Sequence, residues 1–391
     1  MINFQTITKD IFLTDYWQKK PFVFKQAIPG FKNPLSAEEL AGLSLENEIE
    51  SRLVINTPDE TPNWHLKNGP FTEEDYQKLP ESHWTLLVQG VDKLIPEVTN
   101  ILDHFDFIPQ WRLDDIMVSY ATEQGSVGPH YDNYDVFLYQ GKGQRKWSLT
   151  SKNCNPDNYF DNVALRIMEN FDVEEEYILE EGDMLYLPPH IGHHGVSLST
   201  DCITYSIGYR SYQNLEMWDD FGEYLFANKN KETIYKDPNW MKIKNTSELP
   251  SQAIANAKST LLDILNNEDT VNNWFGCFST KLDLTAESQL PLPILESEMP
   301  EQDEFVEKLK QTEFLQRNPI CRFVYQLNDD KTACNLFING QPWDCDGVSL
   351  ELVMMIANQR KVSYKQLIAH LDDNYNVRFL LDMWQLGWVE Y

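Results

Sequence analysis

A histidine and an aspartate stand two residues apart near the middle of the chain, at His130 and Asp132. Alternate residues of a β-strand point to the same side, so this spacing directs an imidazole and a carboxylate into one space. Further along, the segment 188–195 offers a second histidine. Two histidines and one carboxylate on one face of a metal form the facial triad of non-heme Fe(II) oxygenases, which leaves three positions open.

The pair alone is a weak signal, because His-x-Asp arises by chance in many proteins and a hydrogen-bonded loop histidine explains it equally well. The order of features that follow it favours a metal site. They are an apolar strand at 136–139, a Gly-x-Gly turn at 141–143, a basic strand at 145–147, an acidic turn at 180–183 and a double proline before the later histidines. With all of these in order, we predict metal binding.

Oxygen chemistry at Fe(II) needs electrons, which 2-oxoglutarate commonly supplies while it chelates the metal through its keto-acid end. Its far carboxylate then needs a cation, and a guanidinium suits it because it makes two parallel charge-assisted hydrogen bonds. Arg145 is the candidate, since it faces the same side of its strand as Trp147 and Leu149. Lys146 faces the other side. The alternative is that the two basic residues form a surface pair on a strand edge.

Four segments extend the pattern: 130–137, 140–147, 181–189 and 205–210. Together with the opening stretch 16–24, they closely resemble the bacterial JmjC-type ribosomal oxygenases, and the resemblance spans the chain. Members of that family are cupin-fold enzymes that hydroxylate an arginine of the large-subunit ribosomal protein L-sixteen. The resemblance implies that His130, Asp132 and His193 bind Fe(II), and that Arg145 binds 2-oxoglutarate.

The chain departs from the family pattern after the double proline. A single histidine followed by Glu is usual there, whereas this chain has His190, His193 and His194. Spacing from the prolines selects His193 as the third ligand, and His194 remains its competitor. Two acidic residues, Asp115 and Glu123, are interpreted as partners that hold a substrate guanidinium by paired hydrogen bonds.

Short strands separated by Gly or Pro recur from residue 116 to residue 210, which predicts a double-sheet barrel rather than alternating βαβ units. The predicted strands are 116–121, 129–132, 135–140, 145–149, 176–179, 184–187, 194–198 and 203–209. Eight such strands suit a jelly roll, the double-stranded β-helix of cupin and JmjC proteins. We expect the site residues to meet at its mouth.

We predict a mainly β chain with added helices, in three domains. They are a catalytic domain at 1–210 with an α/β lead-in, a helical dimerisation domain at 211–300 and a winged-helix-like domain at 301–391. Apolar residues recur at threes and fours around 215–225 and 254–265, more than a short helical pair can hide, so we expect a homodimer. The alternative is that the tail domain or the barrel covers this apolar face within one chain. In the last helix Arg378 is offset by Asp382, which favours protein contact or a scaffold over DNA reading.

The net charge is −29, from 61 acidic and 32 basic residues. Such a field repels nucleic-acid phosphates and attracts basic partners, so we expect a basic ribosomal protein as substrate and no direct nucleic-acid binding. Six dispersed cysteines are typical of reduced thiols. The start of the chain lacks a signal pattern, and no apolar run reaches membrane-spanning length. We therefore expect a cytoplasmic protein without membrane contact.

Two functions of different classes fit these observations. The first is an Fe(II)- and 2-oxoglutarate-dependent protein hydroxylase that acts on an arginine; the alternative target, for a related barrel with the same triad, is histidine, asparagine or methyl-lysine. The second is a non-catalytic cupin, in which the triad is a structural metal site and the tail is an assembly module. Iron-dependent formation of succinate from 2-oxoglutarate separates the two.

Overall fold

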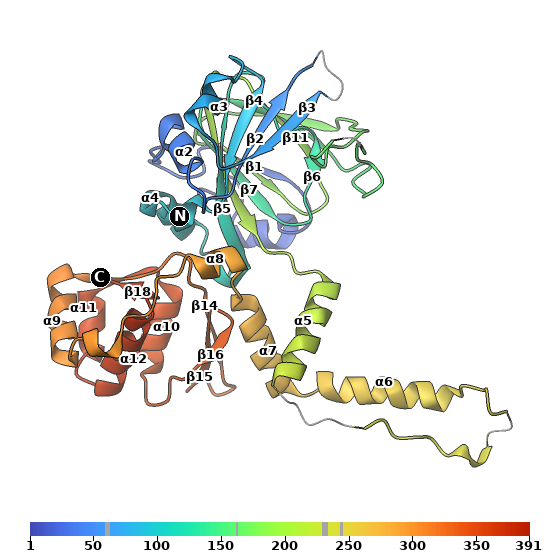
Figure 1. Ribbon diagram of the computed structural model, residues 1–391, viewed down its shortest axis with the longest axis vertical. Helices are drawn as coiled ribbons and strands as arrows, with labels where there is room; N and C mark the ends of the chain where they lie inside the picture. Colours follow the sequence, from blue (N-terminus) through green and yellow to red (C-terminus); the bar gives the residue numbers. More distant parts are fainter. Residues whose placement is uncertain (59–62, 162, 229–233, 243–244) are drawn as a thin grey trace. The chain divides into compact units, whose positions relative to one another are not determined.

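The computed structural model describes residues 1–58, 63–161, 163–228, 234–242 and 245–391 (Figure 1). The chain divides into two compact units, Met1–Ser211 and Tyr212–Tyr391. This division lies beside the predicted boundary after residue 210, and the predicted boundary at residue 300 falls inside the second unit. The division into three domains stays a prediction.

The first unit contains two antiparallel sheets. Over the described residues the larger sheet consists, in order across it, of β1 (Phe22–Phe24), β10 (Met184–Leu187), β7 (Val136–Lys142), β12 (Cys202–Tyr209), β5 (Leu113–Ala121), β4 (Trp84–Val88), β2 (Ser51–Asn56) and β3 (Trp64–Asn68). The smaller consists of β6 (His130–Tyr131), β11 (Gly192–Ser197), β8 (Arg145–Thr150) and β9 (Glu175–Leu179). Every predicted barrel strand is present, with shifted ends.

Strand β7 shows why the central strands are apolar throughout. Val136 and Leu138 belong to one apolar core, whereas Phe137 and Tyr139 belong to another. Successive side chains point to opposite faces of a sheet, so both faces of β7 are buried and the strand reads as a continuous apolar run. The first core joins residues of both sheets and fills the barrel: Val136, Leu138, Trp147, Leu149, Leu179, Leu185 and Leu187.

Short helices accompany the first unit. They are α1 (Lys9–Ile11), which continues as the π-helix η1 (Phe12–Tyr16), α2 (Ala37–Leu43), α3 (Glu73–Gln77), η2 (Val91–Lys93), α4 (Pro96–Thr99), which continues as the 3-10 helix η3 (Asn100–His104), and η4 (Gln110–Arg112). Helix α2 begins at Ser36, whose hydroxyl accepts a hydrogen bond from the Glu39 N–H at 3.2 Å. The Glu39 carboxylate accepts from the Ser36 N–H at 2.8 Å, which completes a capping box.

The predicted strand 194–198 begins earlier, at Gly192, and therefore contains His193. In sequence Gly192 is typical of a turn, but in the structure it pairs with Thr150 of β8. A Cβ at this position would come 2.7 Å from the methyl carbon of Thr150. Close approach of the neighbouring strand is what requires glycine here, and the strand extends through it.

The second unit begins with helices α5 (Asn214–Ala227), η5 (Trp240–Lys242), α6 (Ser251–Leu265), α7 (Glu268–Thr280), α8 (Leu284–Ser288) and η6 (Glu296–Glu298). It ends with α9 (Gln302–Thr312), β13 (Phe314–Arg317), β14 (Phe323–Leu327), β15 (Cys334–Ile338), β16 (Gln341–Trp343), α10 (Leu350–Asn358), β17 (Lys361–Ser363), α11 (Tyr364–Leu367), η7 (Ile368–His370), α12 (Asn374–Gln385) and β18 (Val389–Glu390).

Helix α7 packs against the sheet formed by β14, β15 and β16. Gly276 lies against the Phe337 ring, where a Cβ would come 2.4 Å from a ring carbon, and the Gly340 N–H donates to the Thr280 hydroxyl at 3.0 Å. Over the described ranges, each helix is too short or too polar to cross a bilayer.

Asp135 links the N-terminal segment to the barrel. Its side chain is fully buried and accepts hydrogen bonds from the Tyr186 hydroxyl at 2.5 Å and from Gln18 Nε2 at 3.1 Å. The Arg112 guanidinium lies 3.6 Å away. Burial raises the pKa of Asp135 and these partners lower it. A carboxylate without water is stable only when partners of this kind surround it.

We expect Asp135→Ala to lower the free energy of unfolding by about 2–4 kcal/mol, because it leaves the buried Tyr186 hydroxyl without its acceptor and the Arg112 guanidinium without its anionic partner. The matched control Tyr186→Phe removes one donor, keeps the ring packing and should cost about 1–2 kcal/mol. Urea unfolding measures both values. Wild-type stability of Asp135→Ala would contradict this structural role.

Candidate metal centre

His130, Asp132 and His193 come together in the first unit. Each offers one ligand atom, and these atoms all lie within 4.8 Å of one another. His193 Nε2 is 3.6 Å from a carboxylate oxygen of Asp132, and the centroids of the two imidazole rings are 4.2 Å apart. Within the part of the chain that the structure describes, no second group of His, Cys, Asp or Glu side chains is arranged to share a metal ion.

Strand pairing places the two histidines side by side. His193 of β11 lies directly opposite His130 of β6 and, on its other side, opposite Leu149 of β8. Directly opposite residues of an antiparallel pair present their side chains on the same face. Because Leu149 belongs to the barrel core and His193 is only 3% exposed, both histidines face the interior.

Both histidines present the same nitrogen to the shared space. His130 Nδ1 lies 3.0 Å from the Gly128 carbonyl oxygen, and His193 Nδ1 lies 3.0 Å from that of Ile191. A carbonyl oxygen only accepts, so each Nδ1 carries the proton and each Nε2 keeps a lone pair for a metal. Burial and the neighbouring His130 lower the pKa of His193 to about 4, so this ring is neutral at pH 7.

The sequence predicts a strand at 129–132, but β6 ends at Tyr131. Asp132 therefore lies one residue beyond the strand. Its backbone is held by a hydrogen bond from the His190 N–H to the Asp132 carbonyl oxygen, at 2.8 Å. His190 has a left-handed φ of 63°, which is uncommon for a residue with a Cβ. The exposed His190 therefore contributes to the site through its backbone, by fixing the position of Asp132.

His194 faces the other side of β11. It lies opposite Ser148, and its ring contacts Phe171 at a centroid distance of 6.1 Å. Alternate residues of a strand point to opposite faces, so His194 cannot reach the space that His130 and His193 share. The geometry separates the two competitors for the third ligand and favours His193.

Loss of a residue that only hydrogen-bonds to a metal ligand lowers metal affinity by about 10- to 100-fold. We expect His193→Ala to weaken Mn(II) binding by more than this, because it removes one of the three ligand atoms. The matched control His194→Ala should keep wild-type affinity. Isothermal titration calorimetry with Mn(II) compares them. If His193→Ala keeps Mn(II) binding and His194→Ala loses it, the third metal ligand is His194 and not His193.

Arg145 is a buried cation with hydrogen-bonding capacity to spare. It is 4% exposed, and among the described residues its Nε and Nη2 have no hydrogen-bond partner. Its guanidinium carbon lies 5.6 Å from the centroid of the Trp147 ring. A buried guanidinium is costly until an anion completes its hydrogen bonds, so the barrel interior fits a carboxylate. Lys146, the alternative, faces outward and binds Glu176 at 3.3 Å.

Asp115 and Glu123 do not meet. Asp115 lies near the start of β5, and Glu123 lies in the turn after the strand ends at Ala121. The strand from Asp115 to Ala121 alone spans roughly 20 Å at about 3.3 Å per residue. Burial of its hydroxyl and the charges of Asp132 and Asp115 raise the pKa of Tyr134, although the residue is 42% exposed at the surface. Asp115 and Asp132 therefore both lie near enough to act on this hydroxyl. Glu123 is exposed and follows the other end of β5. The structure brings only Asp115 toward the triad.

The sequence matches the JmjC domain family over residues 100–217 and the ROXA-like winged helix family over residues 263–390. It is 33% identical to the ribosomal protein uL16 3-hydroxylase of Escherichia coli strain K12 over 334 residues, 85% of this chain and 84% of that protein. A probable ribosomal oxygenase of Haemophilus influenzae is also 33% identical, over 86% of this chain and 82% of its own length. The chain belongs to the JmjC-type ribosomal oxygenase family.

A solved structure supports the fold of this ribosomal oxygenase. The E. coli ribosomal oxygenase YcfD, in complex with cobalt and 2-oxoglutarate, superposes with a TM-score of 0.83 at 28% identity and covers 98% of both chains. The predicted family and the predicted fold, a β-barrel followed by helices and a winged helix, are confirmed.

One contact in the barrel of this ribosomal oxygenase gave no signal in the sequence. Gly195 lies directly opposite Trp147, and a Cβ on Gly195 would come 2.6 Å from the indole ring. The missing side chain lets the indole lie between Arg145 and the His193 ring, whose centroid is 5.9 Å from that of Trp147. A glycine inside a strand hints at close approach, but sequence does not say by what.

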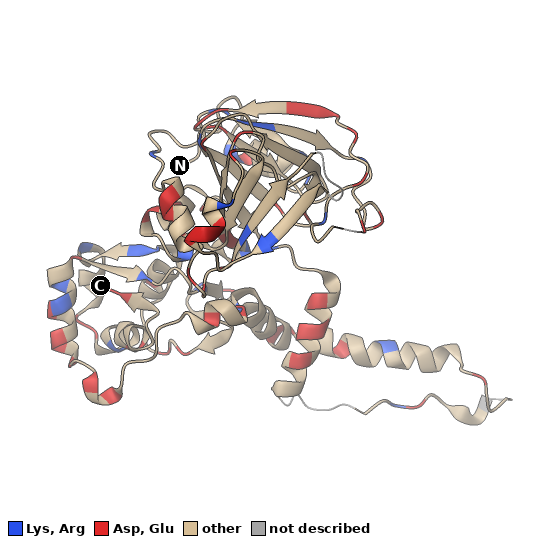
Figure 2. Ribbon diagram, turned by 45° about the horizontal axis from the view of Figure 1, so that its top comes forward, with Lys and Arg blue, Asp and Glu red and all other residues tan. Residues whose placement is uncertain are grey.

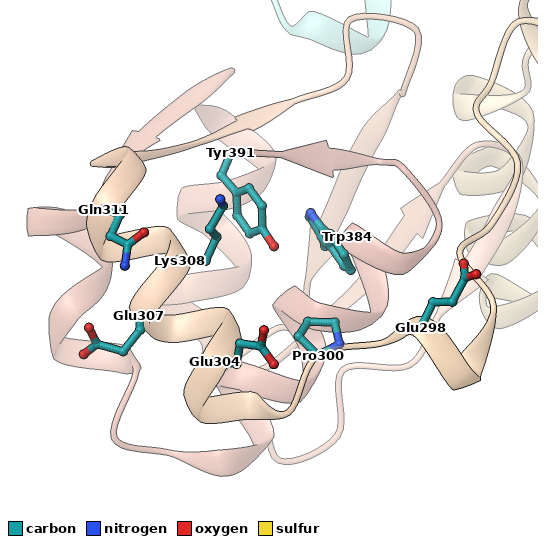
Figure 3. A pocket seen from close by; sticks show the side chains of 8 residues that line it. All are labelled: Glu298, Pro300, Glu304, Glu307, Lys308, Gln311, Trp384 and Tyr391. Carbon is teal, nitrogen blue, oxygen red and sulfur yellow. The ribbon is translucent and has the colours of Figure 1, made fainter.

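The second unit of the ribosomal oxygenase has a hollow of its own (Figure 3). Its volume is about 420 Å³, and its lining residues are Glu298, Pro300, Glu304, Glu307, Lys308, Gln311, Trp384 and Tyr391. Trp384 and Tyr391 stack with their ring centroids 5.4 Å apart. None of the predicted site residues lines it, so the candidate chemistry belongs to the barrel.

Proposed function

We propose that this ribosomal oxygenase is an Fe(II)- and 2-oxoglutarate-dependent protein hydroxylase that acts on an arginine of ribosomal protein uL16, the large-subunit protein L-sixteen. The observation that carries the proposal is a set of three metal ligands and a buried, incompletely hydrogen-bonded guanidinium on the inside of one barrel. Similarity to a uL16 3-hydroxylase over most of both chains supports the substrate. Fe(II) and 2-oxoglutarate together supply the oxidising chemistry when they are bound.

Each residue of the site has a separate task. His130, Asp132 and His193 hold the metal from one face. Arg145 donates paired hydrogen bonds to the far carboxylate of 2-oxoglutarate, in surroundings that exclude water and so strengthen the charge pair. Asp115 accepts hydrogen bonds from the guanidinium of the target arginine and places its side chain at the metal.

Charge supports a basic substrate. Acidic residues occur in both units, and α5 alone carries Glu216, Asp219, Asp220 and Glu223 (Figure 2). The net charge of −29 attracts basic proteins such as those of the ribosome. Arg378 of α12 is paired with Asp382 at 2.7 Å, which offers little to a phosphate, and we propose that the winged helix does not bind nucleic acid directly.

Incubation of the purified protein with Fe(II), 2-oxoglutarate and uL16 tests the function. We expect uL16 to become one oxygen atom heavier, on an arginine, with an equal amount of succinate formed. Asp132→Ala should abolish both products, because only two neutral imidazoles then remain to hold Fe(II). Oxygen on a histidine, an asparagine or a methyl-lysine would reassign the target residue, and a complete lack of succinate would favour the non-catalytic cupin.

We expect Arg145→Ala to raise the KM for 2-oxoglutarate by about 30- to 1000-fold, which corresponds to the roughly 2–4 kcal/mol of a broken buried charge pair. Arg145→Lys keeps the positive charge but lacks the planar guanidinium, so its KM for 2-oxoglutarate should lie between those of the wild type and Arg145→Ala. Mn(II) affinity should remain at the wild-type value in both variants. An unchanged KM would place the co-substrate carboxylate elsewhere.

We also infer that the protein is a homodimer. Helices α5 and α6 expose large apolar side chains: Leu215, Trp218, Phe226, Ile254, Leu261, Leu262 and Leu265. Within the second unit, α5 buries Phe221 against Trp274 of α7, which leaves those other residues uncovered. Exposed apolar side chains in this number on two helices favour an interface, and a second copy related by a two-fold axis supplies a matching surface.

Light scattering tests the dimer. We expect the intact protein to be dimeric at micromolar concentration, and a variant with Leu261→Arg and Leu265→Arg to be a folded monomer. The matched control carries Ser259→Arg and Asp263→Arg, which lie on the other side of α6, and should remain dimeric. A monomeric intact protein would contradict the inference, and a dimeric Leu261/Leu265 variant would place the interface elsewhere.

A further inference from the structure

A chain of polar side chains leads across three strands of the larger sheet to Asp115. Arg52 lies on β2, Gln89 directly follows β4 and Asp115 lies on β5, and these strands are neighbours in the sheet. Arg52 Nη2 donates to Gln89 Oε1 at 3.4 Å, and Gln89 Nε2 donates to Asp115 Oδ2 at 2.7 Å. We call these three residues the Asp115 relay.

The relay has a fixed direction. Arginine has no acceptor, so the carbonyl end of Gln89 must face Arg52, and its amide nitrogen then faces Asp115. A flip of the amide would set donor against donor and acceptor against acceptor, and would lose both hydrogen bonds. Arg52 does not contact the Asp115 carboxylate, but it fixes the orientation of the Gln89 amide and so determines that the amide nitrogen faces Asp115.

The segment after Gln89 holds the same part of β5. The Gly90 N–H lowers the pKa of the Asp115 carboxyl, and the buried Asp92 carboxylate accepts a hydrogen bond from the Ile116 N–H at 2.7 Å. Gly90 has a φ of 64°, and a Cβ there would lie 3.8 Å from Asp115 Oδ2. The left-handed turn thus brings the segment against Oδ2 of the carboxylate.

The other oxygen of Asp115 lies beside Gly208. Oδ1 lies 3.8 Å from the position that a Cβ on Gly208 of β12 would take. Apart from chain neighbours of Gly208, the described residues place only atoms of Asp115 within 4 Å of that position. Because residue 208 is a glycine, no side chain of β12 covers Oδ1 from this position, which leaves that oxygen available to a guanidinium that donates to it.

We infer that Arg52 and Gln89 are positioning residues for the substrate arginine: they hold Asp115 by Oδ2, so that Oδ1 is directed toward Gly208. The inference rests on the proposed function, in which Asp115 receives the target guanidinium. It adds two residues that set the affinity for substrate and that take no part in binding metal or 2-oxoglutarate.

The electrostatics of Asp115 give the relay a measurable signature. Burial and Asp114 raise the pKa of Asp115, whereas Lys93, the Gln89 amide and the Gly90 N–H lower it. The other charged or titratable groups near it are Asp92, whose own pKa burial and Asp115 raise to about 7, together with Tyr134 and Arg52. Loss of the Gln89 donor raises the pKa of Asp115 further. The charged form then requires a higher pH, and so does binding of a cation.

Steady-state kinetics of Gln89→Leu with a uL16 peptide test the inference. We expect the peptide KM to rise about ten-fold or more, because a hydrogen bond to a charged group is lost, and its pH dependence to move to higher pH. The KM for 2-oxoglutarate and Mn(II) affinity should not change. Arg52→Met should act in the same direction, and Arg52→Lys should restore part of the loss.

A peptide with citrulline in place of the target arginine is the matched control, because its neutral side chain should bind wild type and Gln89→Leu alike. An unchanged arginine-peptide KM in Gln89→Leu overturns the relay while uL16 hydroxylation by wild type stands. An equal loss of 2-oxoglutarate binding and thermal stability also overturns it, since that shows a purely structural role. Wild-type protein that leaves uL16 unmodified overturns the proposed function, and the relay with it.

Discussion

The pairing of β11 with β6 on one side and β8 on the other is the constraint on which the active centre depends. One ladder sets His193 opposite His130 and, four residues further, Ser197 opposite Arg145. The metal ligands and the guanidinium are thereby spaced along one inner face. A slip of one residue would turn His193 outward and His194 inward, because the side-chain period of a strand is two. Gly192 and Gly195 permit this pairing by leaving room for the facing strand.

A second constraint is electrostatic. The barrel buries a cation, Arg145, and a carboxylate, Asp115, at separate places and without a common salt bridge between them. Buried charges of this kind cost stability until a partner of opposite sign arrives. In the proposed function, a carboxylate co-substrate pairs with Arg145 and a cationic substrate pairs with Asp115. Each buried charge would then receive a partner of opposite sign from a different ligand.

Local pattern predicted much of this site, because alternation along a strand needs only neighbouring residues. His130 and Asp132 were found by their spacing, and the inward facing of Arg145 by parity with the apolar residues after it. The choice of His193 over His194 depends on where β11 begins, which pairing with two other strands decides and no local pattern shows. Glu123 and Asp115 are both acidic residues near β5, and the sequence alone does not distinguish their roles. The length of β5 places them at opposite ends of the strand. The Asp115 relay joins three strands that are distant in sequence, so periodicity gives no sign of it.

Turnover under isotopically labelled dioxygen tests the central claim most directly, namely that a single metal centre in this barrel couples the oxidation of 2-oxoglutarate to that of an arginine in uL16. Mass spectrometry of both products after one reaction gives the result. The account predicts one labelled oxygen atom in succinate and one in the modified arginine, in equal amounts. Oxygen from water in the arginine, or labelled succinate formed without any change in uL16, would contradict it.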